Sequence, residues 1–172
     1  DVDRLRQLVG MGLNGINLGY VNAPLEPELD LAAHWRRLEG QLEAMAAWLP
    51  IAEAGGARDL CYVYCFDERP ADQLDVLFGT AARIHARFPD IEVMTTAKDP
   101  GLGGGRREGD AVDIWVPLTA EFDGNAGAVA AARARQRQVW WYVCLAPRRP
   151  YANLSVEYDA VEPRLLAGAM AA

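Results

Sequence analysis

Apolar residues along this chain follow two patterns that alternate with each other. Short runs of β-favouring residues predict strands at 14–20, 60–66, 91–95, 111–116 and 139–144. Segments in which apolar residues recur every three or four positions predict helices at 2–9, 31–49, 72–88, 126–137 and 159–170. Five strands that alternate with helices predict an α/β fold with a parallel sheet and right-handed crossovers.

Two architectures fit this alternation: an open doubly wound sheet, or part of a (β/α)8 barrel. A complete barrel needs about 250 residues and eight strands, and this chain of 172 residues supplies five. The glycine-rich segment 101–105 lacks the strand-to-helix turn and the Lys-Ser/Thr pair of a phosphate-binding loop, so we interpret it as a flexible loop. We therefore predict one domain over 1–172, a partial TIM-type barrel whose first and last strands are missing from this chain.

Composition narrows the classes of partner. A net charge of -7 and a pI of about 4.8 argue against a nucleic-acid surface, and we assign the basic run 133–137 to the end of a helix. No segment approaches the roughly 20 apolar residues of a membrane span, and no charged-then-apolar leader opens the chain. We expect no bound metal and no cofactor, because no metal-ligand spacing occurs.

The three cysteines are expected to be free thiols. Cys61 and Cys65 lie four residues apart on one predicted strand, which separates them by roughly 13 Å, too far for a disulfide. We expect all three cysteines to pack as small hydrophobic side chains.

Two adjacent acids, Asp67 and Glu68, end the apolar run 60–66. Ligands of α/β proteins gather outside the carboxyl ends of the strands, so acids at this position are candidates for catalysis. Glycoside hydrolysis needs a proton donor for the leaving oxygen and a group that stabilises an oxocarbenium-like centre. Neighbouring residues are too close along the backbone to flank the bond as independent acid and nucleophile, which favours a substrate-assisted route. In that route Glu68 protonates the leaving oxygen while Asp67 orients the substrate's 2-acetamido group as its oxygen attacks the anomeric carbon.

A regular strand raises an objection to this pair. Residues 67 and 68 would point to opposite faces of the sheet, so they converge only if the strand has ended or bulged before them. The alternative is that both acids stabilise the N-terminus of the following helix, with Pro70 near its start.

Aromatic residues on the later strands are candidates for sugar binding. Trp140 and Tyr142 share one face of their predicted strand, and that face either offers a stacking platform for a sugar or packs between sheet and helices. The same two roles apply to Trp115.

Polar candidates carry similar alternatives. Asp113 lies between apolar residues and serves either in the barrel mouth or in a structural ion pair; a conventional two-carboxylate mechanism would use it as the nucleophile. Tyr151 and Asn153 lie in a loop at the active end of the last strand, where Asn153 either binds a sugar hydroxyl or stabilises a turn. His34 and His85 fall on helices away from the predicted mouth, and we assign them solvent-exposed or helix-packing roles.

Four motifs in order, at 62–68, 112–117, 139–144 and 150–153, make this chain resemble the catalytic domain of glycoside hydrolase family 123. The resemblance implies a (β/α)8-barrel β-N-acetylgalactosaminidase that acts by substrate-assisted, retaining hydrolysis. It assigns Glu68 as the general acid/base and Asp67 as the residue that stabilises the acetamido group. It further implies a glycan or glycoconjugate substrate, a secreted or periplasmic location, and barrel segments supplied by the rest of the same polypeptide.

One departure stands at Arg69, which separates Glu68 from Pro70 where the family commonly reads Asp-Glu-Pro. A non-catalytic carbohydrate-binding or scaffold domain on the same fold is the alternative from a different class.

Overall fold

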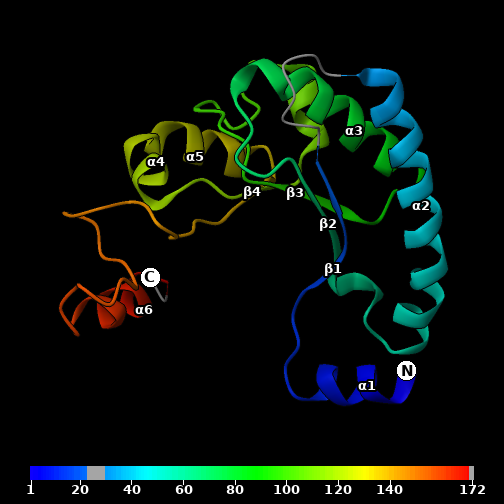
Figure 1. Ribbon diagram of the computed structural model, residues 1–172, viewed down its shortest axis with the longest axis horizontal. Helices are drawn as coiled ribbons and strands as arrows, with labels where there is room; N and C mark the ends of the chain where they lie inside the picture. The colour runs from blue at the N-terminus through cyan, green and yellow to red at the C-terminus, as the bar shows by residue number, and fades with distance from the viewer. Residues whose placement is uncertain (23–29, 171–172) are drawn as a thin grey trace.

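A computed structural model describes residues 1–22 and 30–170, and in these ranges the chain forms one parallel sheet with helices around it (Figure 1). The strands are β1 (Ile16–Val21), β2 (Cys61–Cys65), β3 (Glu92–Thr95), β4 (Ile114–Trp115) and β5 (Gln138–Val139). The α-helices are α1 (Val2–Gly10), α2 (Leu31–Ala54), α3 (Leu74–Arg87), α4 (Thr119–Gly124), α5 (Ala126–Ala134) and α6 (Glu162–Met170). Within the described ranges, none of these helices has the length and apolar character needed to cross a membrane.

The long helix α2 begins and packs as its sequence predicts. The Asp30 side chain accepts a hydrogen bond from the Ala33 backbone N–H at 2.9 Å and so caps the first turn. Four of its predicted apolar positions are buried: Leu38, Leu42, Met45 and Leu49. The helix passes through Pro50 and ends at Ala54, just before the glycine pair at 55–56.

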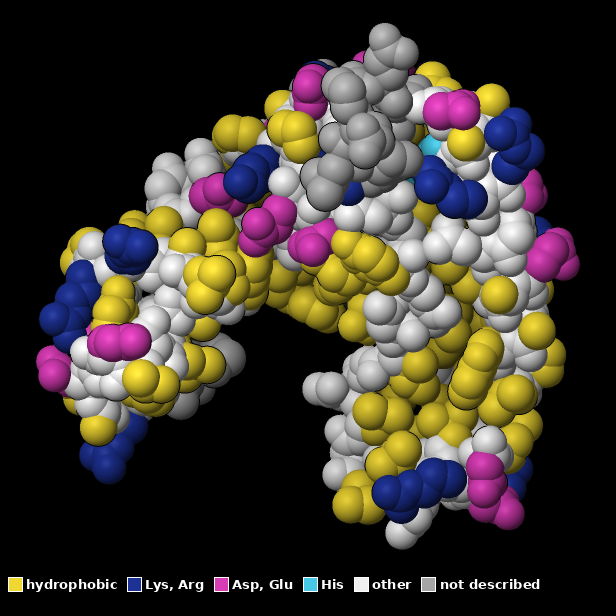
Figure 2. All heavy atoms as spheres, viewed as in Figure 1, with side chains coloured by type: hydrophobic (Ala, Val, Ile, Leu, Met, Phe, Trp, Pro, Cys, Tyr) yellow, Lys and Arg dark blue, Asp and Glu magenta, His cyan; other side chains and the backbone are white. Residues whose placement is uncertain are grey.

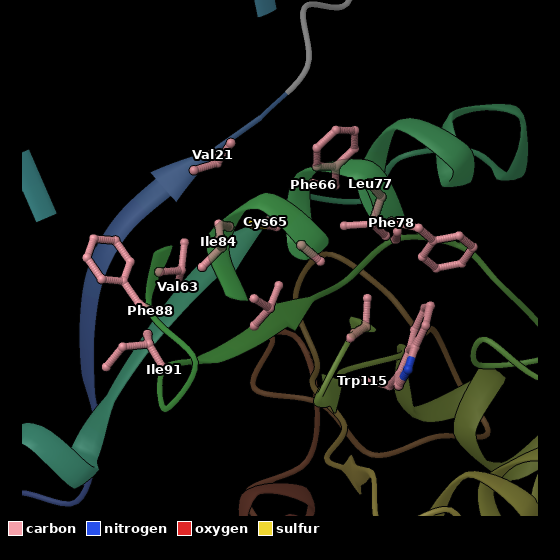
Figure 3. Close-up of a cluster of buried hydrophobic side chains, with 14 of the residues drawn as sticks. Val21, Val63, Cys65, Phe66, Leu77, Phe78, Ile84, Phe88, Ile91 and Trp115 are labelled. Carbon is pink, nitrogen blue, oxygen red and sulfur yellow. The ribbon is translucent and has the colours of Figure 1, made fainter. Parts of the chain in front are cut away.

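One face of the sheet carries the hydrophobic core. Alternate strand residues enter it together with the inward faces of α2, α3 and α5; the strand members include Val63, Cys65, Val93, Trp115 and Val139. Figure 3 shows this arrangement, with Val63, Cys65 and Trp115 grouped with Leu77, Phe78 and Ile84 of α3. The inward positions that the periodicity predicts for α3 are all buried, which confirms its amphipathic pattern: Leu74, Leu77, Phe78, Ala81 and Ile84.

The other face of the sheet, which we call the open face, presents Tyr62, Tyr64, Met94, Gln138 and Trp140. These residues alternate with core positions and are only half-buried or exposed. Figure 2 shows the molecule as an arch, and hydrophobic side chains gather along its hollowed inner side.

The strand order is β1-β2-β3-β4-β5, so neighbours in sequence are neighbours in the sheet. A doubly wound sheet instead reverses its strand order at a switch point. The prediction of an α/β fold with five parallel strands is confirmed, and the uninterrupted order matches successive strands of a (β/α) barrel wall.

The second half of the chain differs most from the sequence prediction. The last two strands are shorter than expected. The start predicted for β4 belongs to the 3-10 helix 107–111. The chain after Val139 pairs with 115–117 without forming a regular ladder, so β5 ends there. Trp140 and Tyr142 donate backbone hydrogen bonds to the Trp115 and Pro117 carbonyls at 2.9 and 3.2 Å, and Pro117 has no N–H to return. The helix α4 was not predicted, and α5 ends at Ala134, before most of the basic run.

The last residue of that basic run has a structural role. Arg137 donates to Asp113 Oδ1 at 2.8 Å, and His85 Nε2 lies 3.0 Å from Asp113 Oδ2. The same carboxylate accepts the Val93 backbone N–H at 2.9 Å. Asp113 precedes β4, so it lies at the amino end of the sheet, and the structural ion pair is the role that the geometry supports.

This cluster predicts a pH-dependent contribution to stability. The hydrogen bond to Asp113 raises the pKa of His85, and the negative charge of Asp113 acts in the same direction against partial burial. Because the folded-state pKa lies above the unfolded value of about 6.5, protonated His85 stabilises the fold below that pH, and this contribution is lost as pH rises through the folded pKa. The stability difference between the parent chain and His85→Gln should therefore be larger at about pH 5.5 than at about pH 9.

Urea unfolding at the two pH values measures this difference. The other histidine serves as the control, because burial lowers the pKa of His34 and its contribution changes in the opposite direction. The parent-minus-variant difference for His34→Gln should therefore be smaller at low pH than at high pH. An equal difference at both pH values for His85→Gln would contradict the assignment.

Candidate active site

The acid pair follows a sharp corner at the end of β2. The strand stops at Cys65, and Phe66 and Glu68 adopt φ values of 57° and 49°, in the left-handed region. Non-glycine residues rarely adopt this conformation, and such outliers cluster at functional sites. In a regular strand the two acids would point to opposite faces of the sheet. That objection does not apply here, because neither acid belongs to a regular strand.

Contacts on three sides fix Phe66 at this corner. Its ring is fully buried in the core (Figure 3). There it meets the His34 ring edge-on, with ring centroids 5.8 Å apart. Its backbone N–H donates to the Val21 carbonyl at 2.8 Å, and its carbonyl accepts from the Thr95 hydroxyl at 3.2 Å. The corner is therefore attached to both neighbouring strands, β1 and β3.

Two hydroxyl groups bind the Asp67 carboxylate. The Tyr64 hydroxyl donates to Asp67 Oδ1 at 2.6 Å, and the Thr96 hydroxyl lies 3.1 Å from the same oxygen. Thr96 Oγ1 also lies 2.8 Å from the Tyr64 hydroxyl and accepts the Glu68 backbone N–H at 3.0 Å. The orientation of Asp67 and the backbone of Glu68 are thus set by residues of β2 and of the loop after β3.

Glu68 contacts a residue far along the chain. The Tyr142 hydroxyl donates a short hydrogen bond to Glu68 Oε1. Burial and this bond to Glu68 raise the pKa of Tyr142. The nearby Tyr64 raises this pKa further. Both acids are exposed to solvent and lie in one cluster with these two tyrosines at the carboxyl end of the sheet.

A third tyrosine belongs to the same cluster. The rings of Tyr20 and Tyr64 lie 5.3 Å apart, and the Tyr20 hydroxyl accepts a hydrogen bond from Asn22 at 2.7 Å. Burial, followed by the charge of Asp67, raises the pKa of Tyr20. Sequence reasoning did not select Tyr20, Tyr64 or Thr96 as site residues. Their position at the ends of consecutive parallel strands was the available signal.

Helix capping does not account for the two acids. The 3-10 helix 71–73 and the helix α3 follow them, and neither receives a side-chain cap. The hydroxyl groups of Tyr64, Thr96 and Tyr142 are the hydrogen-bond partners of the acid pair instead.

Two residues predicted to bind substrate lie elsewhere. Trp115 pairs in register with Thr95 and Val139, so it points into the core face and is fully buried there. Asp113 lies at the amino end of β4 in its ion pairs with His85 and Arg137. Neither side chain lies beside the acid pair. The alternation of side chains along a strand does not reveal which face of β4 meets the helices.

The remaining candidates divide between the open face and the C-terminal loop. Trp140 follows the core residue Val139, lies on the open face and is 43% exposed. Tyr151 donates to Asp123 at 3.1 Å and, within residues 1–22 and 30–170, makes no hydrogen bond to the acid pair. Asn153 is buried, and its amide donates to the carbonyls of Cys144 and Pro147 at 3.1 and 2.9 Å, so it stabilises the turn.

The cysteines and histidines lie outside the cluster. All three cysteines are free thiols; Cys61 and Cys65 are buried, whereas Cys144 is exposed, so its predicted packing is wrong. His34 packs between helices, with its Nε2 2.9 Å from the Thr80 hydroxyl. Among the residues that the structure describes, no group of three or more potential metal ligands gathers.

Comparison with known proteins adds no family assignment. No protein-family model matches this chain, and no curated protein matches it.

The contact between Asp67 and Tyr64 predicts a measurable titration. Burial is the largest cause that raises the pKa of Tyr64, and the hydrogen bond to Asp67 is the next. Replacing the carboxylate in Asp67→Asn should lower the pKa of Tyr64 while leaving it above its usual value, because burial persists. Tyrosinate absorbance at about pH 11 should therefore be higher in this variant than in the parent chain.

The exposed Asp72 provides the matched control, because it makes no hydrogen bond to a tyrosine in the part of the chain that the structure describes. Identical absorbance curves for the parent chain and Asp67→Asn would show that Tyr64 is not bound to Asp67 in solution.

Proposed function

We propose that this chain carries the catalytic centre of a retaining β-N-acetylhexosaminidase, with N-acetylgalactosamine as the preferred sugar. One observation supports this most strongly: the corner after β2 turns both carboxylates of the pair to the same edge of the sheet, where a tyrosine hydroxyl binds each of them. The resemblance of the four motifs to glycoside hydrolase family 123 supplies the reaction and the sugar.

Asp67 suits the role of stabilising the substrate's acetamido group. Both neighbouring hydroxyls reach its Oδ1, so Oδ2 is the oxygen that can accept the amide N–H of the sugar. As the acetamido oxygen attacks the anomeric carbon, positive charge develops on the resulting oxazolinium ring. A fixed carboxylate beside that ring stabilises the charge without having to reorient.

Glu68 suits the role of general acid/base. Tyr142 donates to Oε1, which leaves Oε2 to carry the proton that is transferred to the glycosidic oxygen as its bond to the anomeric carbon breaks. The resulting carboxylate then accepts a proton from water as that water attacks the same face of the anomeric carbon. Two inversions at one centre give net retention.

A conventional pair of carboxylates is less well supported. That mechanism would use Asp113 as the nucleophile, at about 5–5.5 Å from the acid. Asp113 lies level with Val93, directly before β4, which is separated from β2 by β3. Two strand spacings alone amount to ~9.6 Å. Its carboxylate is also bound to Arg137 and His85.

The open face suggests what the remaining polypeptide does. Half-buried Tyr62, Tyr64 and Met94 would form part of a barrel interior if further strands closed the sheet. We propose that such strands belong to the same polypeptide, and that the glycan enters at the carboxyl end of the closed barrel.

The decisive experiment compares two substrates. The full-length protein should hydrolyse an aryl β-N-acetylgalactosaminide. The matching 2-hydroxy glycoside, which lacks the acetamido group, should be a very poor substrate. Comparable rates on both would rule out the substrate-assisted mechanism. Sugar binding without turnover, and unaffected by Glu68→Gln, would instead identify a carbohydrate-binding domain.

Variants of the acid pair should lower activity more than a variant of the tyrosine that binds Asp67. Glu68→Gln and Asp67→Asn should each reduce kcat by about 10²–10⁴-fold, because each removes a group that acts in the transition state. Tyr64→Phe removes one hydrogen bond to Asp67 and should cost only about tenfold in kcat/KM. Asp72→Asn, five residues from Asp67 and outside the cluster, is the control that should retain the parent rate.

A further inference from the structure

One oxygen atom of Thr96 contacts three groups of the acid cluster. Thr96 Oγ1 accepts the Glu68 backbone N–H at 3.0 Å and lies 2.8 Å from the Tyr64 hydroxyl. The same atom lies 3.1 Å from Asp67 Oδ1. Thr96 therefore contacts both members of the acid pair, whereas Tyr64 contacts Asp67 and Tyr142 contacts Glu68.

The backbone on both sides of Thr96 is held in place. Thr95 pairs in register with Cys65 of β2, and its carbonyl accepts the Val116 N–H at 2.9 Å. The Ala97 N–H donates to the Thr95 hydroxyl at 3.0 Å. Because Thr95 is buried in the core, alternation places half-buried Thr96 on the open face, at the carboxyl end of β3. A branched β-carbon further restricts the rotamers of Thr96, so its oxygen is held beside the acids.

Two hydroxyl protons serve three contacts between oxygen atoms. The Tyr64 hydroxyl, Thr96 Oγ1 and Asp67 Oδ1 form a triangle with edges of 2.6, 2.8 and 3.1 Å. The shortest edge joins Tyr64 to Asp67, as expected for a hydroxyl that donates to a carboxylate, so the Tyr64 proton lies on this edge. The Thr96 proton then has two acceptors, and the Tyr64 oxygen is the nearer of them.

The ionisation of Tyr64 supports this direction. Burial and then the hydrogen bond to Asp67 raise the pKa of Tyr64, whereas the hydrogen bond with Thr96 lowers it. A donor that points at the phenol oxygen has this effect, because it stabilises the negative phenolate. The Glu68 N–H thus donates to Thr96, Thr96 donates to Tyr64, and Tyr64 donates to Asp67. Hydrogen bonds that follow one another in this way polarise and strengthen each other.

We propose that Thr96 is a positioning residue for the hydrolysis, because it joins the backbone of Glu68 to the carboxylate of Asp67 through this chain of hydrogen bonds. The proposal rests on the proposed function for the roles of the two acids. It gives Thr96 no contact with the sugar and no part in proton transfer. Both acids act on one sugar ring in the same transition state, so the reaction needs a fixed separation between them, and the chain supplies it.

Kinetics of Thr96 variants test the role of the hydroxyl. In the full-length protein, Thr96→Val keeps the shape of the side chain but removes the acceptor of the Glu68 N–H and the donor to Tyr64. This variant should lower kcat for an aryl β-N-acetylgalactosaminide by about 10–100-fold. Thr96→Ser retains the oxygen and should stay within about threefold of the parent kcat.

The matched control is Thr80→Val, which removes a threonine hydroxyl from α3, outside the cluster, and should keep the parent kcat. Equal rates for Thr96→Val and Thr96→Ser, whether at the parent value or below it, would overturn the role of the hydroxyl.

Titration of Tyr64 tests the chain without any turnover. A ring fluorine placed on Tyr64 lowers the pKa of the phenol into a measurable range, and fluorine NMR reports its ionisation. Thr96→Val should move the midpoint to higher pH, because the phenolate loses a donor, and Thr96→Ser should leave it near the parent value. Thr95→Val is the control for packing, because the Thr95 hydroxyl binds the Phe66 carbonyl and not Tyr64.

The two measurements separate this proposal from the proposed function. A midpoint that Thr96→Val leaves unmoved or lowers would overturn the chain, even if the protein hydrolyses the glycoside. A midpoint that moves as expected in a protein that hydrolyses no glycoside would support the chain and reject the proposed function.

Discussion

The corner at Phe66, Asp67 and Glu68 is the constraint on which the candidate site depends. Two of its three residues adopt the left-handed conformation, which costs roughly 1–2 kcal/mol for each non-glycine residue. The buried Phe66 ring and the hydrogen bonds to Val21 and Thr95 hold the backbone there. The same core that stabilises the sheet therefore sets the direction of the two carboxylates.

The parallel sheet brings the partners of the acids to that corner. Tyr64 stands at the end of β2, Thr96 follows β3, and Tyr142 follows β5, so residues up to 78 positions apart meet at one edge. Because all five strands run in the same direction, each strand delivers its last residues to the same edge. The hydroxyl groups at this edge bind two solvent-exposed carboxylates that would otherwise be free to rotate.

The five strands and every α-helix except α4 could be predicted from sequence, but the faces of the later strands could not. Helical periodicity in α2 and α3 is strong because one wide face of each packs on the sheet. By contrast, β4 has only two residues, and alternation over so short a strand does not reveal that Trp115 enters the core. The role of Asp113 depended on His85 and Arg137, which lie 28 and 24 residues away, a distance that no local pattern reports.

The side chains at 66 and 68 explain why non-glycine residues occupy these left-handed positions. Glycine at 66 and 68 would adopt the same backbone with little penalty, yet it would remove the ring that anchors the corner and the carboxylate that contacts Tyr142. Phe66 compensates for its own strain through burial, whereas Glu68 is exposed and gains little from packing. A strained, exposed acid is therefore expected where the position of the acid matters more than its contribution to stability. Stability explains the left-handed conformation of buried Phe66 better than that of exposed Glu68, and Glu68 is the proposed general acid.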